Sequence, residues 1–346
     1  MLAWQALAYG VDGNPGDTIS KLVLKDDVPI PVAKDGQVVI KVEICAINPI
    51  DWKLFSGGFD GMFPLTFPYT PCFDISGTVS AVGAGVTALA VGDEVCVDLG
   101  LVETCGAGKP LGPCGGLAQY AVALAETVSK RGTLTAEIAA GLPLAGLTAY
   151  QALFTGCATS FAGTPLGQLT SGQKLLILGG STAVGQYAIQ LAKNAGVSVT
   201  VTCSAATMAD GTSKADYLKQ LGANETICYK EADWATVLAG RDFDQILDAV
   251  GSEEDWAKAP GVLKAGGDYV TIANFTTQPS ADDKVKFKVF LLKSMASDLD
   301  VLVGMVEKGV LKVPIDHVYD FKDAPAALAK SFELANMGKL LVKVPQ

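Results

Sequence analysis

A turn rich in glycine and hydroxyl residues stands where the chain passes from an apolar segment into an amphipathic one. The stretch KLLILGGSTAVGQYAIQLAKNAG predicts a buried strand, a tight turn and a helix that ends at Gly196. Backbone N–H groups at such a helix start, with the positive end of the helix dipole, hold a pyrophosphate without a cationic side chain. The residues expected to do so are Gly180, Ser181, Thr182, Ala183 and Val184.

This glycine turn departs from the G-x-G-x-x-G pattern of dinucleotide-binding proteins at one position. Read from Gly180 to Gly185, it has Thr182 where the middle glycine is expected, and a hydroxyl side chain there narrows the approach to the phosphates. The prediction therefore rests on the strand–turn–helix context. A tight turn that binds no ligand is the alternative.

The end of the following predicted strand indicates which dinucleotide fits. An acidic residue there binds the ribose 2′-hydroxyl of NAD and repels a 2′-phosphate. The stretch VSVTVTC ends instead in Thr202, Cys203 and Ser204, and Lys214 follows before the next helix. Hydroxyl groups and one ammonium group suit a 2′-phosphate, which predicts NADPH as the cofactor. The alternative for Lys214 is a solvated surface lysine.

Residues that bind metals or form disulfides are arranged poorly for either purpose. The chain has one histidine, His317, and eight cysteines that never occur as C-x-x-C. This spacing argues against a disulfide framework and against a zinc knuckle. We therefore expect a protein of a reducing compartment.

The elements that must position these residues change in kind along the chain. Up to about Val128, short alternating runs such as VVIKVEICAI and ISGTVSAVG predict strands of a β domain, with long loops at 56–71 and 105–116. From TAEIAAG onward, strands alternate with helices, which predicts a doubly wound parallel sheet. The apolar stretch at 285–309 is expected to be helical, and KLLVKV to be a strand.

Composition fits a globular protein of two domains. The chain has 346 residues, of which 49% are hydrophobic and 18% charged, which excludes a highly charged disordered chain. A net charge of −10 disfavours nucleic acid as a partner. The sequence shows neither a secretory signal nor an unbroken apolar run of about 18 residues. We expect a cytoplasmic protein without membrane insertion.

Taken together, nine stretches in the same order resemble the medium-chain dehydrogenase/reductase superfamily in its zinc-independent quinone oxidoreductase branch. The resemblance runs nearly end to end. The matching stretches are AINPIDWK, PCFDISGTVSAVG, VGDEV, GGLAQYAV, PLAGLTAYQAL, LGGSTAVGQYAIQLAK, LGANETICY, DAVG and MGKLLVKV.

The resemblance implies an α/β fold of two domains. A GroES-like, β-rich catalytic domain comprises residues 1–128 and 276–346, and a doubly wound Rossmann domain that binds NADPH comprises 129–275. The active site is expected in the cleft between them. Relatives commonly form homodimers.

Zinc-dependent alcohol dehydrogenases of this superfamily carry a Cys in the first motif and Gly-His-Glu in the second. Here Asn48 stands at the position of that Cys, and Cys72-Phe73-Asp74 replaces Gly-His-Glu. The four close cysteines of a structural zinc lobe are reduced to Cys105 and Cys114. Without imidazole and with few clustered thiolates, no metal site is expected.

The resemblance also assigns residues around NADPH. Ser204, Lys214 and Tyr229 fall where relatives hold the 2′-phosphate, with Ser213 as a competitor for Ser204. The residues expected near the nicotinamide or its ribose are Thr148, Val250 and Ile272. For Tyr229 and Ile272 the alternative is plain core packing.

Two residues of AINPIDWK are the expected catalytic residues. Asn48 is expected to donate a hydrogen bond to a substrate carbonyl or to fix the nicotinamide ribose, and Trp52 to form an aromatic wall. The alternatives are a turn residue before Pro49 and a core aromatic residue.

Without a metal, hydride transfer from NADPH to a quinone or another electron-poor enone is the favoured chemistry, because it needs mainly orientation. The alternatives are a 2-enoyl thioester reductase and a regulatory protein that binds NADPH without turnover. Tyr69, beside the second motif, is expected to be structural.

Overall fold

The computed structural model describes all residues except 101–114, 156–165, 167, 209, 278–283 and 335. The chain divides into two compact units. The first unit contains Met1–Ala145, Ser294–Gly309 and Val313–Gln346, and the second contains Gly146–Lys293 and Val310–Lys312. Of the predicted loops, 105–116 lies almost wholly outside the described residues, as do Cys105, Cys114 and Cys157.

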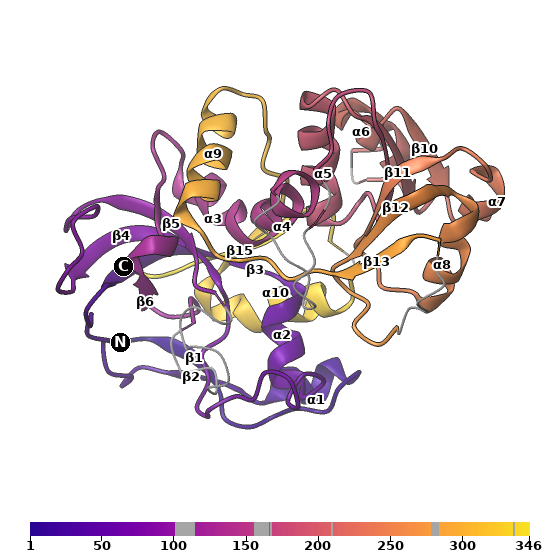
Figure 1. Ribbon diagram of the computed structural model, residues 1–346. Helices are drawn as coiled ribbons and strands as arrows, with labels where there is room; N and C mark the ends of the chain where they lie inside the picture. Colours follow the sequence, from indigo (N-terminus) through magenta and orange to yellow (C-terminus); the bar gives the residue numbers. More distant parts are fainter. Residues whose placement is uncertain (101–114, 156–165, 167, 209, 278–283, 335) are drawn as a thin grey trace. The chain divides into compact units, whose positions relative to one another are not determined.

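The second unit is built on a six-stranded parallel sheet (Figure 1). Its strands are β8 (Lys174–Leu178), β9 (Ser198–Cys203), β10 (Glu225–Cys228), β11 (Phe243–Asp248), β12 (Leu263–Thr271) and β13 (Lys286–Val289). Their order is β10-β9-β8-β11-β12-β13, and all pairs are parallel. The strand order therefore reverses between β8 and β11: β9 and β10 lie on one side of β8, and β11, β12 and β13 lie on the other. This is the predicted doubly wound Rossmann sheet, and ligands bind such sheets at the carboxyl ends of the strands near that reversal.

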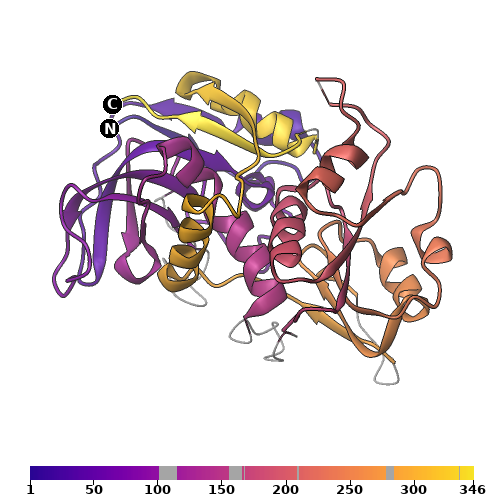
Figure 2. The ribbon, with the colours of Figure 1, turned by 90° about the horizontal axis from the view of Figure 1, so that it is seen from above.

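Short polar residues start the helices that connect these strands. The helices are α5 (Ala183–Asn194), α6 (Lys214–Leu221), α7 (Trp234–Val237) and α8 (Glu253–Lys258), and α4 (Pro143–Phe154) leads into the unit. The side chains of Thr182, Ser213, Asp233 and Ser252 each accept a backbone N–H of the helix they cap. Figures 1 and 2 show α5 and α6 on one side of the sheet and α8 on the other.

The expectation of one helix over 285–309 was wrong in its first part. Lys286–Val289 forms β13, which pairs with β12, and only Ala296–Glu307 forms a helix, α9. The physical reason lies in the local period. Phe287 and Val289 alternate with Lys286 and Lys288, which suits a strand at the edge of a sheet.

The first unit is the predicted β-rich domain. Its larger sheet contains β3 (Gln37–Ile47), β4 (Asp74–Val82), β5 (Glu94–Asp98), β6 (Tyr120–Leu124), β7 (Ser129–Lys130), β14 (Ile315–Asp320) and β15 (Lys339–Lys343). The strands β1 (Ala3–Ala6) and β2 (Leu22–Lys25) form a separate antiparallel pair. Central β3 pairs with β4, β6 and β15, so the C-terminal strand completes a sheet begun near the N-terminus.

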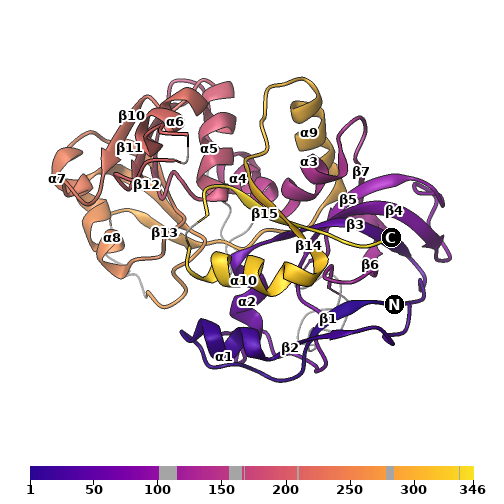
Figure 3. The same ribbon diagram turned by 180° about the vertical axis from the view of Figure 1, so that it is seen from behind.

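Helices cover parts of this first unit. They are α1 (Pro15–Ser20), α2 (Pro49–Ser56), α3 (Ala136–Gly141), α9 and α10 (Ala324–Phe332). Helix α10 contacts α2, β14 and β15, as Figure 3 shows from behind. The core beneath them includes Trp52, Phe55 and Leu328.

The compact units depart from the expected domain boundaries of 128 and 276. Residues 129–145 belong to the first unit because β7 pairs with β5 and α3 contacts β3, β4 and β15. Residues 276–293 belong to the second unit because β13 extends the parallel sheet. Among the described residues, no helix is both long and apolar enough to cross a bilayer.

Candidate functional site

The glycine turn of the second unit follows β8 and is tied to the neighbouring strand β9. Gly179, at φ +89°, donates its N–H to the Thr202 hydroxyl at 3.0 Å, and Gly180 donates to the Thr202 carbonyl at 2.9 Å. A Cβ on Gly185 would lie 2.4 Å from the Gly179 carbonyl oxygen. The turn therefore brings the start of α5 against the end of β8 at a distance that only glycine permits.

Thr182, which replaces the middle glycine of the fingerprint, is the N-cap of α5. Its hydroxyl donates to the Gly179 carbonyl at 2.9 Å and accepts the Gly185 N–H at 3.0 Å. The hydroxyl is thus used within the turn. The N–H groups of Ala183 and Val184 lie in the first turn of the helix, where helix geometry provides no acceptor, so they suit an anion.

Three residues predicted to hold a 2′-phosphate lie at the ends of β9 and β10 and the start of α6. Ser204 follows β9 directly, Tyr229 follows β10, and the Tyr229 N–H donates to the Cys203 carbonyl at 3.1 Å. Tyr229 is 52% exposed, which disfavours the core-packing alternative. Lys214 is the first residue of α6 and is half-buried.

Ser213, the alternative to Ser204 for binding the 2′-phosphate, stabilises the start of a helix. Its hydroxyl accepts the Asp216 N–H at 3.0 Å and donates to the Asp216 carboxylate at 2.7 Å, which makes it the N-cap of α6. Ser204 is therefore favoured as the serine that meets a phosphate.

The ends of β11 and β12 carry Val250 and Ile272. The buried Asp248 holds this edge in place, because its carboxylate accepts the N–H groups of Val250 and Gly251, both at 2.9 Å, and the Thr271 hydroxyl at 2.8 Å. Val250 is 58% exposed. Ile272 is half-buried, and its N–H donates to the Asp248 carbonyl.

The structure thus gathers most predicted cofactor residues at the carboxyl edge of one parallel sheet. The exceptions are Thr148, which lies in α4 and is 5% exposed, and Asn48, which precedes α2 in the first unit. The residues at the sheet edge are Gly180, Ser181, Thr182, Ala183, Val184, Ser204, Lys214, Tyr229, Val250 and Ile272.

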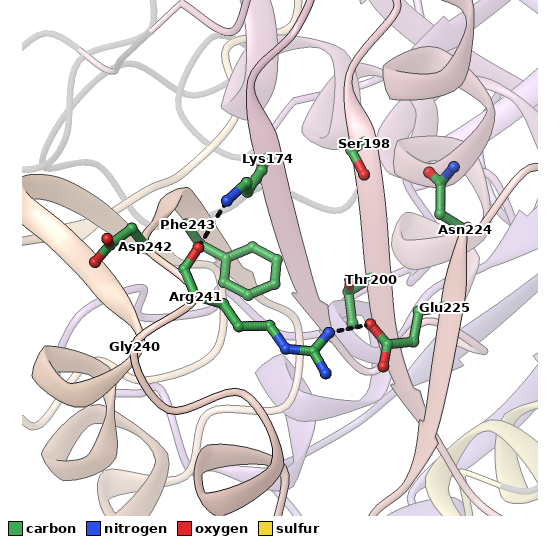
Figure 4. Close-up of a pocket in the computed structure, with 9 residues that line it drawn as sticks. All are labelled: Lys174, Ser198, Thr200, Asn224, Glu225, Gly240, Arg241, Asp242 and Phe243. Atoms are coloured by element: carbon green, nitrogen blue, oxygen red, sulfur yellow. Dashed lines mark hydrogen bonds and ion pairs between the residues drawn. The ribbon is translucent and has the colours of Figure 1, made fainter.

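A pocket of about 630 Å³ lies at the opposite, amino edge of this sheet (Figure 4). Lys174, Ser198 and Glu225 line it, and each is the first residue of its strand. Three of its charged side chains already have partners: Arg241 forms an ion pair with Glu225 at 2.6 Å, and the Lys174 ammonium donates to the Arg241 backbone carbonyl at 2.8 Å. This pocket is therefore a poor candidate for the dinucleotide.

The first unit holds a buried polar cluster of Asn48, Asp51, Asp74 and Lys339, each no more than 3% exposed. The sheet register assembles it, because Ile47 of β3 faces Leu340 of β15, and Ala46 faces Asp74 of β4. The Lys339 ammonium donates to the Asn48 amide oxygen and, at 2.9 Å, to Asp74. Lys339 was missed by the sequence analysis, although it lies in the quoted stretch MGKLLVKV.

The hydrogen bonds of Asn48 define what its side chain can do. Lysine only donates, so the amide oxygen of Asn48 must face Lys339. The amide nitrogen donates to Asp74 at 2.9 Å and to the Ala46 carbonyl at 3.3 Å, which uses both of its hydrogens. Asn48 therefore has no free donor for a substrate carbonyl in this arrangement, and its oxygen keeps one lone pair for a further donor.

Asp51 anchors the start of α2 behind Asn48. Its carboxylate accepts the Asn48 N–H at 2.6 Å and the Phe73 N–H at 3.1 Å. Burial is the main cause that raises the pKa of Asp51 to about 8, against the opposing effect of these N–H groups and of Lys339. Asp51 thus binds backbone N–H groups.

Trp52 lies in the core of the first unit. It is 6% exposed, stacks on Phe332 at 4.0 Å between ring centroids, and donates its indole N–H to the Ser331 hydroxyl at 3.2 Å. This packing favours the core alternative over an aromatic wall for substrate. Tyr69 is also buried, at 3% exposed, which fits a structural role.

Asn48, Phe73 and Asp74 stand at the positions of zinc ligands, and Cys72 precedes Phe73 at the position of a glycine. Phe73 has no atom that binds a metal, and Asn48 and Asp74 bind other protein groups. Asp74 is held by Lys339, Asn48 and the Leu144 N–H at 2.8 Å. Burial raises the pKa of Cys72 well above its ordinary value, so the thiol keeps its proton. In the described part of the chain, no group of three His, Cys, Asp or Glu residues is placed to hold a metal ion.

Comparisons with known proteins agree with this architecture. Residues 34–132 match the family "Alcohol dehydrogenase GroES-like domain", and residues 221–342 match "Zinc-binding dehydrogenase". The chain is 32% identical over 329 residues to a chloroplast envelope quinone oxidoreductase homolog of Arabidopsis thaliana, with 91% of this chain and 92% of the relative covered. It is 28% identical to a trans-enoyl reductase of Aspergillus terreus, with 100% and 97% covered.

A solved structure extends the likeness to three dimensions. The quinone oxidoreductase of Coxiella burnetii superposes with a TM-score of 0.81 at 28% identity, with 100% of this chain and 99% of that chain covered. The sheet order, the glycine turn and these matches agree along nearly the whole chain, and the protein therefore belongs to the medium-chain dehydrogenase/reductase superfamily as an oxidoreductase of the quinone oxidoreductase type.

Proposed function

We propose that this protein is an NADPH-dependent reductase that transfers hydride to quinones or other electron-poor enones without zinc. The observation that carries the cofactor choice is the set of Ser204 and Tyr229, directly after β9 and β10, and Lys214, at the start of α6, with no acidic residue at the end of β9. A 2′-phosphate meets hydroxyl groups and an ammonium group there rather than a carboxylate.

The chain's own groups bind and orient the cofactor. The first-turn N–H groups of α5 hold the pyrophosphate, and Lys214 neutralises part of the 2′-phosphate charge. NADPH, when bound, supplies the hydride. Val250 and Ile272, at the ends of β11 and β12, line the sheet edge toward the nicotinamide, with Thr148 of α4 in the same proposed role.

Asn48 serves best as an orienting acceptor. Since both amide hydrogens are used internally, the remaining lone pair of its oxygen suits a ribose hydroxyl rather than a substrate carbonyl. Lys339 and Asp74 act as positioning residues, because they fix the amide from both sides. The product proton then comes from another side chain or from water.

Steady-state kinetics with an aromatic ortho-quinone test this proposal. We expect a much lower KM for NADPH than for NADH. Lys214→Ala removes a charge-assisted bond worth about 1–3 kcal/mol, and should raise the KM for NADPH while leaving that for NADH nearly unchanged. Lys219→Ala, at the other end of the same helix, is the matched control. Equal use of both cofactors by the unaltered protein would overturn the assignment.

A second candidate is a reductase of 2-enoyl thioesters, which the name of the Aspergillus terreus relative favours. A short enoyl thioester offered in place of the quinone separates the two. Faster turnover of the thioester supports this second candidate. Tight binding of NADPH without turnover of either acceptor supports a third candidate function, that of a regulatory protein that binds the nucleotide.

We also propose a cytoplasmic homodimer, on the resemblance to relatives that pair. Sedimentation of the purified protein tests the dimer, and a single species with the mass of one chain would contradict it.

A further inference from the structure

We propose that Cys203 and Cys228 form a thiol-modification site, a pair that a hydroperoxide closes to a disulfide beside the 2′-phosphate site. The effect on the cofactor rests on the proposed function, whereas the disulfide itself does not.

The sheet register places the two thiols next to each other. Cys203 is the last residue of β9 and Cys228 the last of β10, and the two are direct partners across the parallel strands. Neighbouring strands lie about 4.7–4.9 Å apart, which is within the Cα separation of about 4.4–6.8 Å that a disulfide spans. Partners in register point to the same face of the sheet.

The electrostatics of Cys203 agree with this placement. Burial is the main cause that raises the pKa of Cys203, and the neighbouring Cys228 thiol raises it further. Both thiols are free. Cys203 is 1% exposed whereas Cys228 is half-buried, so an oxidant from solvent meets Cys228 first.

The chemistry follows from this difference in access. The Cys228 sulfur attacks the hydroperoxide, forms a sulfenic acid and releases one molecule of water when the oxidant is hydrogen peroxide. The Cys203 sulfur then attacks the sulfenic sulfur, the S–S bond forms, and a second water leaves. Two thiols lose two hydrogen atoms and one peroxide is reduced to two waters.

The disulfide forms at the residues that meet the cofactor. Ser204 and Tyr229 each follow one of the two cysteines, and the Tyr229 N–H donates to the Cys203 carbonyl. A bond between the sulfur atoms fixes the two strand ends to each other and displaces these neighbours. We therefore expect the oxidised protein to bind NADPH less tightly than the reduced protein.

Mapping by mass spectrometry tests the site directly. The full-length protein is treated with hydrogen peroxide, blocked with iodoacetamide under denaturing conditions and digested with trypsin. Cys203 lies in peptide 194–214 and Cys228 in peptide 220–230, each with no other cysteine. We expect these peptides joined, two hydrogen atoms lighter than their sum, and separated again by dithiothreitol.

Variants and an internal comparison sharpen the test. Cys228→Ser and Cys203→Ala should each abolish the joined peptide, with thermal unfolding recorded to show that both fold. The thiols of Cys45 and Cys72 also neighbour each other but are buried at no more than 1% exposed, so they should stay reduced. No joined peptide, or one that joins Cys45 to Cys72 instead, overturns the proposal.

Titration of the reduced and the oxidised protein with NADPH tests whether the disulfide affects cofactor binding. We expect Kd for NADPH to rise about tenfold on oxidation, as for one lost charge-assisted bond, and not to rise in Cys228→Ser. An unchanged Kd with the disulfide present overturns the coupling to the cofactor. Absence of NADPH binding by the reduced protein instead refutes the proposed function, and the peptide masses still report on the disulfide.

Discussion

At the residue scale, a buried ion pair defines the polar cluster of the first unit. Lys339 is 1% exposed and Asp74 is fully buried, so both charges have left water. Such pairs add little net stability, because desolvation offsets their attraction. Their value lies in geometry: the pair fixes both ends of the Asn48 amide, which a hydrophobic replacement could not do.

Lys339→Met should destabilise the protein strongly. The substitution leaves the Asp74 carboxylate buried without its counter-charge, which costs about 3–5 kcal/mol. Unfolding in urea measures this loss. Lys130→Met is the control in the same unit. The Lys130 side chain is 58% exposed, so its ion pair with Asp93 contributes no more than about 1 kcal/mol to the free energy of unfolding. Equal effects of the two variants would contradict the buried charge.

Asp51 gives the cluster a pH dependence. Burial raises its pKa from 3.8 to about 8, so the folded protein keeps a proton that the unfolded chain releases. Stability is therefore lost as pH rises from about 4 to about 8, by up to about 1.4 kcal/mol per pH unit. Comparing urea unfolding of the unaltered protein with Asp51→Asn, whose amide does not titrate, isolates this slope.

The control for that comparison is Asp60→Asn, an exposed carboxylate just after α2. This variant removes one negative charge at the surface and leaves the buried Asp51 in place. The difference in the free energy of unfolding between the unaltered protein and Asp51→Asn should change between pH 5 and pH 8. If it is the same at both pH values, Asp51 is ionised throughout and the proposed proton is absent.

At the element scale, the join between β8 and α5 depends on a missing side chain. Gly185→Ala places a methyl group 2.4 Å from the Gly179 carbonyl oxygen, and overpacking of this kind costs about 1–3 kcal/mol. The displaced turn should also lose NADPH affinity. Gly304→Ala in α9 is the matched control, because its Cβ meets nothing within 4 Å.

Calorimetry and NADPH titration measure both effects. Gly304→Ala should keep NADPH binding and gain up to about 1 kcal/mol, since alanine stabilises a helix relative to glycine. If Gly185→Ala has unchanged NADPH affinity and unchanged stability, the turn accommodates the methyl group without a loss of free energy. The close approach of α5 to Gly179 would then be unimportant for cofactor binding.

Local patterns in the sequence predicted most of these elements. The alternation in VSVTVTC and the strand–turn–helix pattern around Gly180 depend on neighbours within a few residues, so local sequence predicted them. The sequence analysis did not predict that Thr182 and Ser213 are N-caps, because it considered both only as neighbours of a phosphate. The pairing of Lys339 with Asn48 spans 291 residues and depends on the register of β15 against β3. No local pattern encodes that register. Burial of Trp52 likewise depends on Phe332, far along the chain.

At the scale of the whole molecule, the residues of the proposed function are divided between the two units. The second unit contains the sheet edge assigned to the dinucleotide, and the first contains the Asn48 cluster. A ligand that binds only the folded second unit stabilises it by mass action, by about 2.7 kcal/mol at a concentration 100 times Kd. NADPH should therefore raise the thermal midpoint more than NADH does at equal concentration, as measured by scanning calorimetry.

The presence or absence of zinc also concerns the whole molecule, because one family match carries the description "Zinc-binding dehydrogenase". At the positions of zinc ligands, the Lys339 ammonium already binds Asp74 and Asn48, and a dication beside it would be repelled. A protonated Cys72 thiol is also a poor ligand.

Dialysis against 1,10-phenanthroline should therefore leave quinone turnover and the thermal midpoint unchanged, while a zinc alcohol dehydrogenase treated in parallel loses activity. Turnover that disappears on dialysis and returns with stoichiometric zinc would mean that the cluster opens to bind the metal, and the zinc-free mechanism would then be wrong.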